Sequence, residues 1–286
     1  MMKKHGRTGL FLPLLLACCS AFATAADRPS TAQPNVSVLA PPLAMPGLNR
    51  TRTVRLYLPP SYAASPDKRY PVIYMHDGQN LFDAATSYAG EWRVDETLNE
   101  LARTRGFEAI VVGIDNGGER RMAEMSPTLN AKIGASEGPQ YLAFIVDVVK
   151  PLIDKSYRTR PDRLNTALMG SSMGGLISHA GLLRYPAVFG RLGVFSPSYW
   201  VSPVMFERAA TLAPPGGTRV YLYAGGREGD DGSMVTDARR MADVLAKRMV
   251  AQDLTLHIEP KAEHNEAAWA AEFGRAVVWL FEPAGR

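Results

Sequence analysis

The sequence predicts an α/β domain in which helices cover both faces of a mostly parallel β-sheet. Short runs of β-branched and aliphatic residues alternate along the chain with longer segments of helical periodicity. Repeated strand, helix, strand order produces parallel strands joined by crossover helices. The chain has 286 residues, of which 46% are hydrophobic and 21% charged. This balance is typical of a soluble globular protein and excludes disordered and multi-pass membrane classes.

The strands are expected in short apolar runs that start near residues 36–39. They continue at residues 53–58, 72–75, 110–114, 166–169, 192–195, 220–223 and 254–258. The helices are expected at residues 94–105, 139–153, 173–184, 203–212, 236–249 and 267–281. Only a turn region, residues 59–67, separates the strands at 53–58 and 72–75, which predicts an antiparallel edge.

The first 25 residues have the pattern of a secretory signal peptide. Basic residues precede a short apolar run at residues 10–22, which is followed by Ala23-Thr24-Ala25. The run is too short to span a bilayer. We therefore expect a signal peptide at 1–25, a tether rich in Pro, Ala and Ser at 26–46, and a single α/β domain at 47–286. An alternative is a lipoprotein whose mature chain begins at a lipidated Cys18.

Charge and cysteine content restrict the classes of partner. The formal net charge is +4, and removal of the three positive charges at Lys3, Lys4 and Arg7 leaves about +1. This near-neutral mature chain has no concentrated basic patch, so no nucleic-acid partner is expected. Both cysteines, Cys18 and Cys19, lie in the predicted signal peptide, so we expect neither a disulfide nor a cysteine metal site in the mature protein.

The segment Gly170-Ser171-Ser172-Met173-Gly174 joins a strand-like run to a helical pattern. Gly-x-Ser-x-Gly at such a junction is the pattern of a nucleophile elbow, a sharp turn that exposes the serine hydroxyl at the end of a sheet. The start of the following helix supplies free backbone N–H groups and a positive dipole end. Ser172 is therefore the candidate nucleophile, and Ser171 is the neighbour whose side chain points away.

A serine nucleophile needs a histidine base, and the chain has five histidines. His264 lies in a polar loop between the last strand and the last helix, where a base that follows nucleophile and acid in the chain is expected. His5 belongs to the predicted signal peptide, and His179 lies about 10 Å along the helix from the elbow. His257 falls inside a strand, so a packing role is expected for it, and His76 ends an early strand, where it is expected to shape the cleft rather than to transfer a proton.

The acid is expected on the loop after the strand at 220–223. That loop reads Gly225-Gly226-Arg227-Glu228-Gly229-Asp230-Asp231. Glu228 is preferred because it lies at the turn itself, whereas Asp230 and Asp231 approach the next helix. Its role is to orient the imidazole and to stabilise its protonated form.

The loop after the strand at 72–75 forms the opposite wall of the predicted site. There the backbone N–H of Gln79 is assigned as one oxyanion donor and that of Met173 as the other. Asp77 and Asp83 are expected to cap turns, and no metal site is predicted from them. Trp92, Trp200 and Trp269 are expected to fill the core, with an aromatic acyl pocket as the alternative reading.

Four segments together resemble the putative-esterase family of α/β hydrolases, which includes enterobactin, salmochelin and feruloyl esterases, S-formylglutathione hydrolases and mycolyltransferases. The segments span residues 55–62, 70–83, 170–176 and 196–200. The resemblance covers about residues 35–282 and implies an eight-stranded α/β-hydrolase fold. It also implies Ser172 as nucleophile, His264 as base, an acid on the loop 225–231, and Gln79 and Met173 as oxyanion donors.

These observations predict a secreted or periplasmic serine esterase that acts on small-molecule esters through an acyl-enzyme and needs no cofactor or metal. Two alternatives stay open. The same residues could transfer the acyl group to an alcohol or sugar acceptor, and the fold could also serve a non-catalytic binding protein. Siderophore, feruloyl, acetyl and thioester substrates all fit the sequence, which does not determine the oligomeric state.

Overall fold

The computed structural model describes residues 28–131, 133–229 and 232–282. Its main feature is an eight-stranded sheet with the strand order β1-β4-β6-β5-β7-β8-β9-β10. These strands are β1 (Val36–Val38), β4 (Val54–Tyr57), β6 (Ile110–Ile114), β5 (Val72–His76), β7 (Thr166–Ser171), β8 (Arg191–Phe195), β9 (Arg219–Gly225) and β10 (Leu254–Glu259). Strands β5 to β10 are mutually parallel, whereas β1 runs antiparallel to β4 and β4 runs antiparallel to β6. The predicted α/β-hydrolase fold is therefore confirmed.

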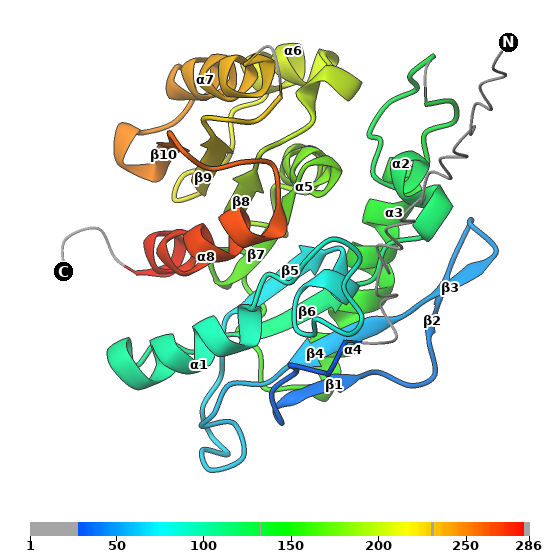
Figure 1. The fold of residues 1–286 in the computed structure, drawn as a ribbon, viewed down its shortest axis with the longest axis vertical. Coiled ribbons are helices and arrows are strands. Elements are labelled where there is room, and N and C mark those ends of the chain that lie inside the picture. The colour runs from blue at the N-terminus through cyan, green and yellow to red at the C-terminus, as the bar shows by residue number, and fades with distance from the viewer. Residues whose placement is uncertain (1–27, 132, 230–231, 283–286) are drawn as a thin grey trace, which may run out of the picture.

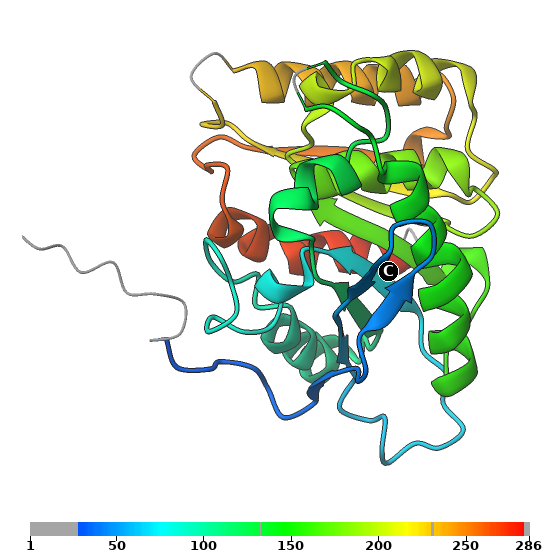
Figure 2. The same cartoon turned by 90° about the vertical axis from the view of Figure 1, so that its right-hand side faces the viewer.

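Helices cover both faces of the sheet (Figure 1 and Figure 2). The helices are α1 (Val94–Arg105), α2 (Arg121–Glu124), α3 (Gly138–Phe144), α4 (Lys150–Ser156), α5 (Met173–Arg184), α6 (Val204–Thr211), α7 (Ser233–Ala246) and α8 (Glu266–Phe281). Residues of α1 and α8 share one buried apolar cluster with the sheet, and residues of α3 to α7 share the other. The sheet is consequently buried on both faces, which explains why its central strands are continuous apolar runs.

The antiparallel edge is present as predicted, but its pairing differs from the expectation. β4 pairs with β6, and β5 lies one strand further in. α1 carries the chain from β5 to β6 on one side, and α3 and α4 then carry it back to β7 on the other side of β5. The order of the first strands is thus set by the crossovers rather than by the short turn between β4 and β5.

The helix expected at 139–153 is divided. α3 and α4 are joined by a π-helical turn at Ile145–Val149, directly before Pro151. Proline has no N–H to donate to the carbonyl of residue 147, and a widened turn accommodates the missing bond.

The structure also contains a two-stranded hairpin of β2 (Leu43–Met45) and β3 (Arg50–Arg52) that the sequence analysis did not predict. Its arginines contact buried Glu124 of α2, Arg50 at 3.3 Å and Arg52 at 2.5 Å. Burial raises the pKa of Glu124, although the two arginines act in the opposite direction. Strands of three residues carry too little periodicity to be recognised.

Two histidines are completely buried away from solvent. His76 Nδ1 lies 2.8 Å from the hydroxyl of Tyr141, and His179 Nδ1 lies 2.9 Å from that of Tyr199. Their Nε2 atoms are buried and have no hydrogen-bond partner within the part of the chain that the structure describes. Burial lowers the pKa of each imidazole from 6.5 to about 4. Both rings are therefore neutral in the folded protein at neutral pH.

This burial predicts a component of acid sensitivity that His179→Gln removes. Between pH 6.5 and about 4 the unfolded chain binds a proton at His179 that the folded chain does not. The contribution of the neutral His179 to the free energy of unfolding is thus fully present above pH 6.5. It decreases by about 1.4 kcal/mol per pH unit as the pH falls from 6.5 to about 4. In urea unfolding at several pH values, we expect the slope of the unfolding free energy against pH to be smaller by about this amount in His179→Gln than in the wild type. Parallel curves would contradict a neutral His179.

Candidate active site

Ser172 lies at the sharp turn between β7 and α5, with φ of 56° and ψ of −119°. A non-glycine residue at such angles is strained and persists only where the surroundings fix it. Two backbone bonds do so here, since Ser172 N donates to Phe195 O at 2.9 Å and Ser198 N donates to Ser172 O at 3.1 Å. A Cβ atom at Gly170 would lie 2.9 Å from the backbone carbon of Gly174, so the turn closes only with glycine there. The geometry is that of a nucleophile elbow.

Glu228 and His264 lie together beyond the carboxyl end of β9. Glu228 is completely buried, and its Oε2 lies 3.4 Å from Nδ1 of His264, whose side chain is 32% exposed. The other oxygen, Oε1, accepts hydrogen bonds from Gly225 N at 2.7 Å and from Ser196 Oγ at 2.5 Å. A carboxylate held by donors on one side and facing an imidazole on the other is arranged to orient that ring. Asp230 and Asp231, the other candidates for the acid, lie outside the described residues.

The Ser172 hydroxyl hydrogen-bonds Ser198 Oγ, at 3.2 Å. Within the described parts of the chain, no hydrogen bond joins Ser172 to His264. The turn after β8 connects the two halves of the site, because Ser198 contacts Ser172 while Ser196 contacts Glu228. The structure thus pairs the predicted acid with the predicted base, and the turn after β8 contacts both this pair and the predicted nucleophile.

A tryptophan holds the acid and the base from one side. Trp269 Nε1 donates to Ser196 Oγ at 2.9 Å, and its ring meets the His264 ring nearly perpendicularly at 5.0 Å between centroids. Trp269 and Trp92 are both buried and pack on each other, as expected for core residues. Sequence analysis assigned no role to Ser196 or Ser198, although both occur in the segment that carries the family resemblance.

Gln79 and Met173, the predicted oxyanion donors, come from the two segments that face each other at the elbow. Gln79 lies in a 3₁₀ turn, Gly78–Asn80, directly after β5, and Met173 is the first residue of α5. An amide at the first position of a helix has no acceptor within the helix. The side chain of Gln79 is anchored, since its Oε1 accepts from Asn116 N at 3.1 Å.

Asp77 supports the loop that carries Gln79. Arg121 donates two hydrogen bonds to its carboxylate, at 2.6 and 2.9 Å, and Asn116 donates a third at 2.6 Å. Burial alone would raise the pKa of Asp77, but Arg121 and Asn116 outweigh it and keep the pKa below the ordinary value. The role of Asp77 is therefore an ion pair rather than the expected turn cap, and Arg121 was not identified from sequence.

The expectation for Asp83 was correct. Asp83 Oδ1 accepts from Ala85 N at 2.9 Å, as expected of a turn cap, and from Thr31 N at 3.1 Å. The carboxylate thus closes its own turn and also holds the segment that precedes β1.

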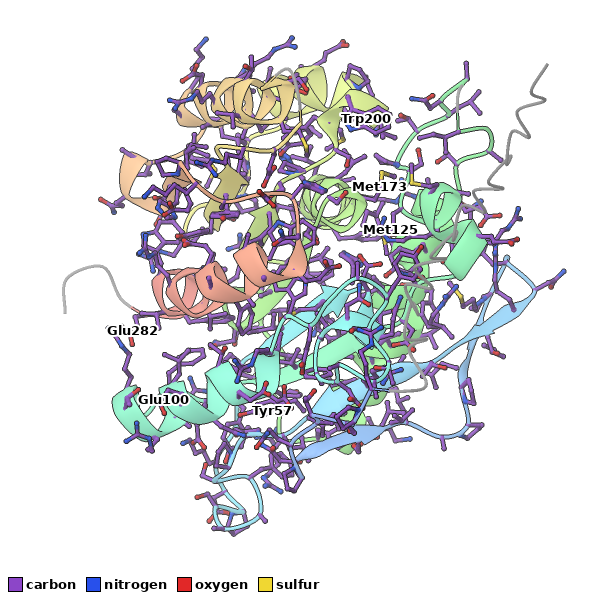
Figure 3. All side chains as sticks on the ribbon, in the orientation of Figure 1. Tyr57, Glu100, Met125, Met173, Trp200 and Glu282 are labelled. Carbon is purple, nitrogen blue, oxygen red and sulfur yellow. The ribbon has the colours of Figure 1, made fainter. Side chains whose placement is uncertain are left out.

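The expectation that Trp200 fills the core was wrong, because the turn at Tyr199–Val201 places its side chain at the surface. It is 54% exposed, and with residues 128–131 and 201–204 it lines an open pocket of about 460 Å³. The loop at 128–131 is held to this wall because Thr128 Oγ1 lies 2.6 Å from Ser202 Oγ and Asn130 donates to Val201 O at 2.6 Å. Figure 3 shows Trp200 and Met173 on the same side of the molecule in this view.

The other histidines that the structure describes make different contacts, and His5 lies outside the described residues. His76 packs beneath the elbow, where its Cδ2 would lie 2.9 Å from a Cβ atom at Gly170. His257 of β10 pairs with Glu272 at 2.8 Å on the face covered by α8.

In the described parts of the chain, no helix is long and apolar enough to cross a membrane.

Residues 46–280 match the model of a family described as putative esterase. The chain is 28% identical over 242 residues to the uncharacterised protein YbbA of Bacillus subtilis, and the aligned region covers 80% of this chain and 92% of the relative. It is 26% identical to the ferri-bacillibactin esterase BesA of the same organism, over 57% of this chain and 60% of the relative.

Among solved structures, the enterobactin esterase from Shigella flexneri superposes with a TM-score of 0.72 at 18% identity, over 91% of this chain and 62% of the other. At this level of identity the superposition supports the fold. The family match covers most of the chain, and relatives in the family are named as esterases. The chain therefore belongs to the putative-esterase family of α/β hydrolases and is a carboxylic-ester hydrolase.

Proposed function

We propose that the protein hydrolyses small-molecule esters through an acyl-enzyme on Ser172, with His264 as general base and Glu228 as the orienting acid. The observation that carries the proposal is the buried Glu228 carboxylate, 3.4 Å from the His264 ring and tied through Ser196 to the turn that holds Ser172. Such a buried acid paired with a partly exposed histidine beside a strained serine is the arrangement that acyl transfer requires.

In the first half of the reaction, Ser172 Oγ attacks the ester carbonyl carbon while His264 Nε2 takes the hydroxyl proton. The hydroxyl must turn from Ser198 to His264 for this step, and such contacts often tighten only when substrate binds. Glu228 accepts the Nδ1–H of His264 and stabilises the imidazolium. The backbone N–H groups of Gln79 and Met173 donate to the tetrahedral oxyanion.

In the second half, the imidazolium gives its proton to the leaving alkoxide, so that the alcohol departs and the acyl group stays on Ser172. His264 then removes a proton from water, which attacks the acyl carbonyl carbon. Collapse of the second tetrahedral intermediate returns the proton to Ser172 and releases the carboxylic acid. An alcohol acceptor in place of water would give acyl transfer instead, and product analysis with and without acceptor separates the two reactions.

The proposal is tested by covalent labelling with a fluorophosphonate, which phosphonylates activated serines. We expect stoichiometric labelling of the folded protein and a modified peptide that contains Ser172, as determined by mass spectrometry. Heat-denatured protein serves as the control and is expected to remain unlabelled. Labelling of another serine, or none, would contradict the assignment of the nucleophile.

For the substrate, we propose an ester whose acyl part carries an aromatic ring, such as a siderophore ester or a feruloyl ester. The support is the exposed indole of Trp200 beside an open pocket, together with the similarity to a ferri-bacillibactin esterase. A hydrolysis panel of siderophore, feruloyl, acetyl and thioester substrates tests this choice.

Trp200→Ala is expected to raise KM for an ester with an aromatic acyl group by about three- to tenfold, because one aromatic contact contributes about 0.5 to 1.5 kcal/mol. KM for an acetyl ester is expected to stay nearly constant, since an acetyl group does not reach a ring stack. Initial rates over a range of substrate concentrations give both values. Equal changes for the two esters would show that Trp200 acts on the pocket as a whole rather than on an aryl group.

We further propose that the enzyme is exported. The predicted signal peptide at 1–25 and both cysteines lie outside the described residues, so the support is the sequence pattern. The intact mass of the protein purified from the whole cell envelope distinguishes a chain released by signal-peptide cleavage from a lipoprotein. A chain that begins at residue 26 supports a signal peptide of the ordinary type, and a chain that begins at a lipidated Cys18 supports the lipoprotein.

A further inference from the structure

Three carboxylates lie together at the start of α1. One oxygen from each of Glu91, Asp95 and Glu96 lies within 4.8 Å of the other two. Asp95 is completely buried, and Glu91 and Glu96 are partly buried. We refer to these three residues as the α1 carboxylate cluster.

In the two carboxylates nearest the N-terminal segment, only one oxygen is satisfied by a protein donor. Glu91 Oε2 accepts from Thr31 Oγ1 at 2.9 Å, and Asp95 Oδ2 accepts from Gln33 N at 2.9 Å. The second oxygens, Glu91 Oε1 and Asp95 Oδ1, are buried and have no hydrogen-bond partner among the residues that the structure describes. Buried polar atoms are nearly always paired, so each of these two oxygens calls for a proton or a ligand beyond those residues.

Glu96 completes the same pattern. Its Oε1 lies 3.7 Å from Arg93 Nε, and its Oε2 is buried with no hydrogen-bond partner in the described ranges of the chain. Arg93 is 65% exposed and is the cation paired with the cluster. The positive end of the helix dipole favours acids in this first turn, but it does not satisfy buried lone pairs.

The cluster needs positive charge to exist in this geometry. Asp95 is completely buried and Glu91 and Glu96 are partly buried, so three negative charges this close together repel one another with little screening by water. Either a proton shared between Asp95 and Glu96 or a bound cation would relieve the repulsion, and the two possibilities differ in what they do with the third carboxylate. A single shared proton leaves the free oxygen of Glu91 unpaired, whereas a cation can contact all three.

We propose that Glu91, Asp95 and Glu96 bind a divalent cation, and that the cation is Ca²⁺. Carboxylate oxygens are the ligands that Ca²⁺ prefers, at 2.3 to 2.6 Å, and two ligands of one ion are then at most about 5 Å apart. The oxygens of the cluster meet that limit. Glu91 and Glu96 also line an open groove between α1 and α8, which gives the ion a path from solvent and room for water ligands.

The ion joins the segment before β1 to the body of the domain. Thr31 and Gln33 bond the cluster directly, and Ser30 Oγ donates to Asp83 Oδ2 at 2.9 Å nearby. Ca²⁺ at the cluster therefore fixes the orientation of the carboxylates that hold this segment. Its role is structural and independent of the proposed ester hydrolysis.

The test compares thermal unfolding of the chelator-treated full protein at pH 7.5 in EDTA and in CaCl₂. We expect Ca²⁺ to raise Tm by about 5 °C or more at a concentration about a hundred times Kd. Tb³⁺ gives a direct readout of binding, since excitation of the adjacent Trp92 is expected to sensitise its luminescence, and Ca²⁺ is expected to displace it. Titration calorimetry with Ca²⁺ gives the stoichiometry, which we expect to be one.

Asp95→Asn and Glu91→Gln each remove one ligand charge and are expected to abolish the Ca²⁺ response. Glu91→Gln covers the case in which the buried Asp95→Asn fails to fold. The matched control is Glu100→Gln, one turn further along α1 (Figure 3). The Glu100 carboxylate is 57% exposed and pairs with Arg103. It is expected to retain the full response. A wild type whose Tm does not change with Ca²⁺, combined with an Asp95→Asn variant of higher Tm, would overturn the proposal in favour of the shared proton.

Discussion

Ser172→Ala is expected to lower kcat/KM for ester hydrolysis by about 10⁴- to 10⁶-fold, as loss of the catalytic serine does in triad enzymes. Without the hydroxyl no acyl-enzyme can form, and the oxyanion donors and His264 can assist only direct attack by water. Steady-state kinetics on the preferred ester, with a detection limit of 10⁻⁶ of the wild-type rate, measures the loss. The backbone at 172 is equally strained with alanine, so Tm is expected to stay nearly constant.

The matched control for this variant is Ser171→Ala, which removes the neighbouring hydroxyl from the buried end of β7. Its activity is expected to remain within about threefold of the wild type. An equal loss in the two variants would indicate damage to the elbow rather than loss of a nucleophile. A Ser172→Ala variant that keeps a tenth of the activity would exclude Ser172.

Glu228→Gln is expected to lower kcat by about 10³- to 10⁴-fold with little change in KM. The amide fits the same volume, and its oxygen can still accept from Gly225 N and Ser196 Oγ. Its NH₂ group then faces Nδ1 of His264, which favours the tautomer with the proton on Nε2, and that ring cannot take the serine proton. Kinetics at saturating ester measures the effect, and Tm checks that the buried site is intact.

Asp230→Asn and Asp231→Asn distinguish Glu228 from the other acids on the same loop. We expect both to keep kcat within about threefold of the wild type. If one of them loses as much activity as Glu228→Gln does, the acid that orients His264 is that aspartate. Glu228→Asp, which shortens the side chain but keeps its charge, is expected to recover part of the lost activity.

Much of the fold could be predicted because the sheet is buried on both faces. A strand between two helix layers must be apolar throughout, and the central strands are therefore visible as short runs between longer periodic segments. α1 and α5 begin and end where their patterns do, since Gly106 ends the first and Ser172 precedes the second. Strand order could not be obtained this way, because it depends on which way each crossover turns.

The candidate site was predictable only where it follows strand ends. Ser172, Gln79 and Glu228 each come directly after a parallel strand, and such strands end at one edge of the sheet. Arg121 lies in a four-residue helix that does not directly follow a strand, and nothing in its local sequence relates it to Asp77. Ser196 was equally hidden, because its role depends on a buried hydrogen bond to a residue 32 positions away.

The perpendicular contact between Trp269 and His264 provides an optical reporter built into the enzyme. A proton gained by the imidazole places a positive charge against the indole ring, whose emission responds to nearby charge. The same indole donates to Ser196, which in turn bonds the Glu228 carboxylate. With the other three tryptophans replaced by phenylalanine, the fluorescence of Trp269 alone would follow the charge state of the base in real time, with no substrate present.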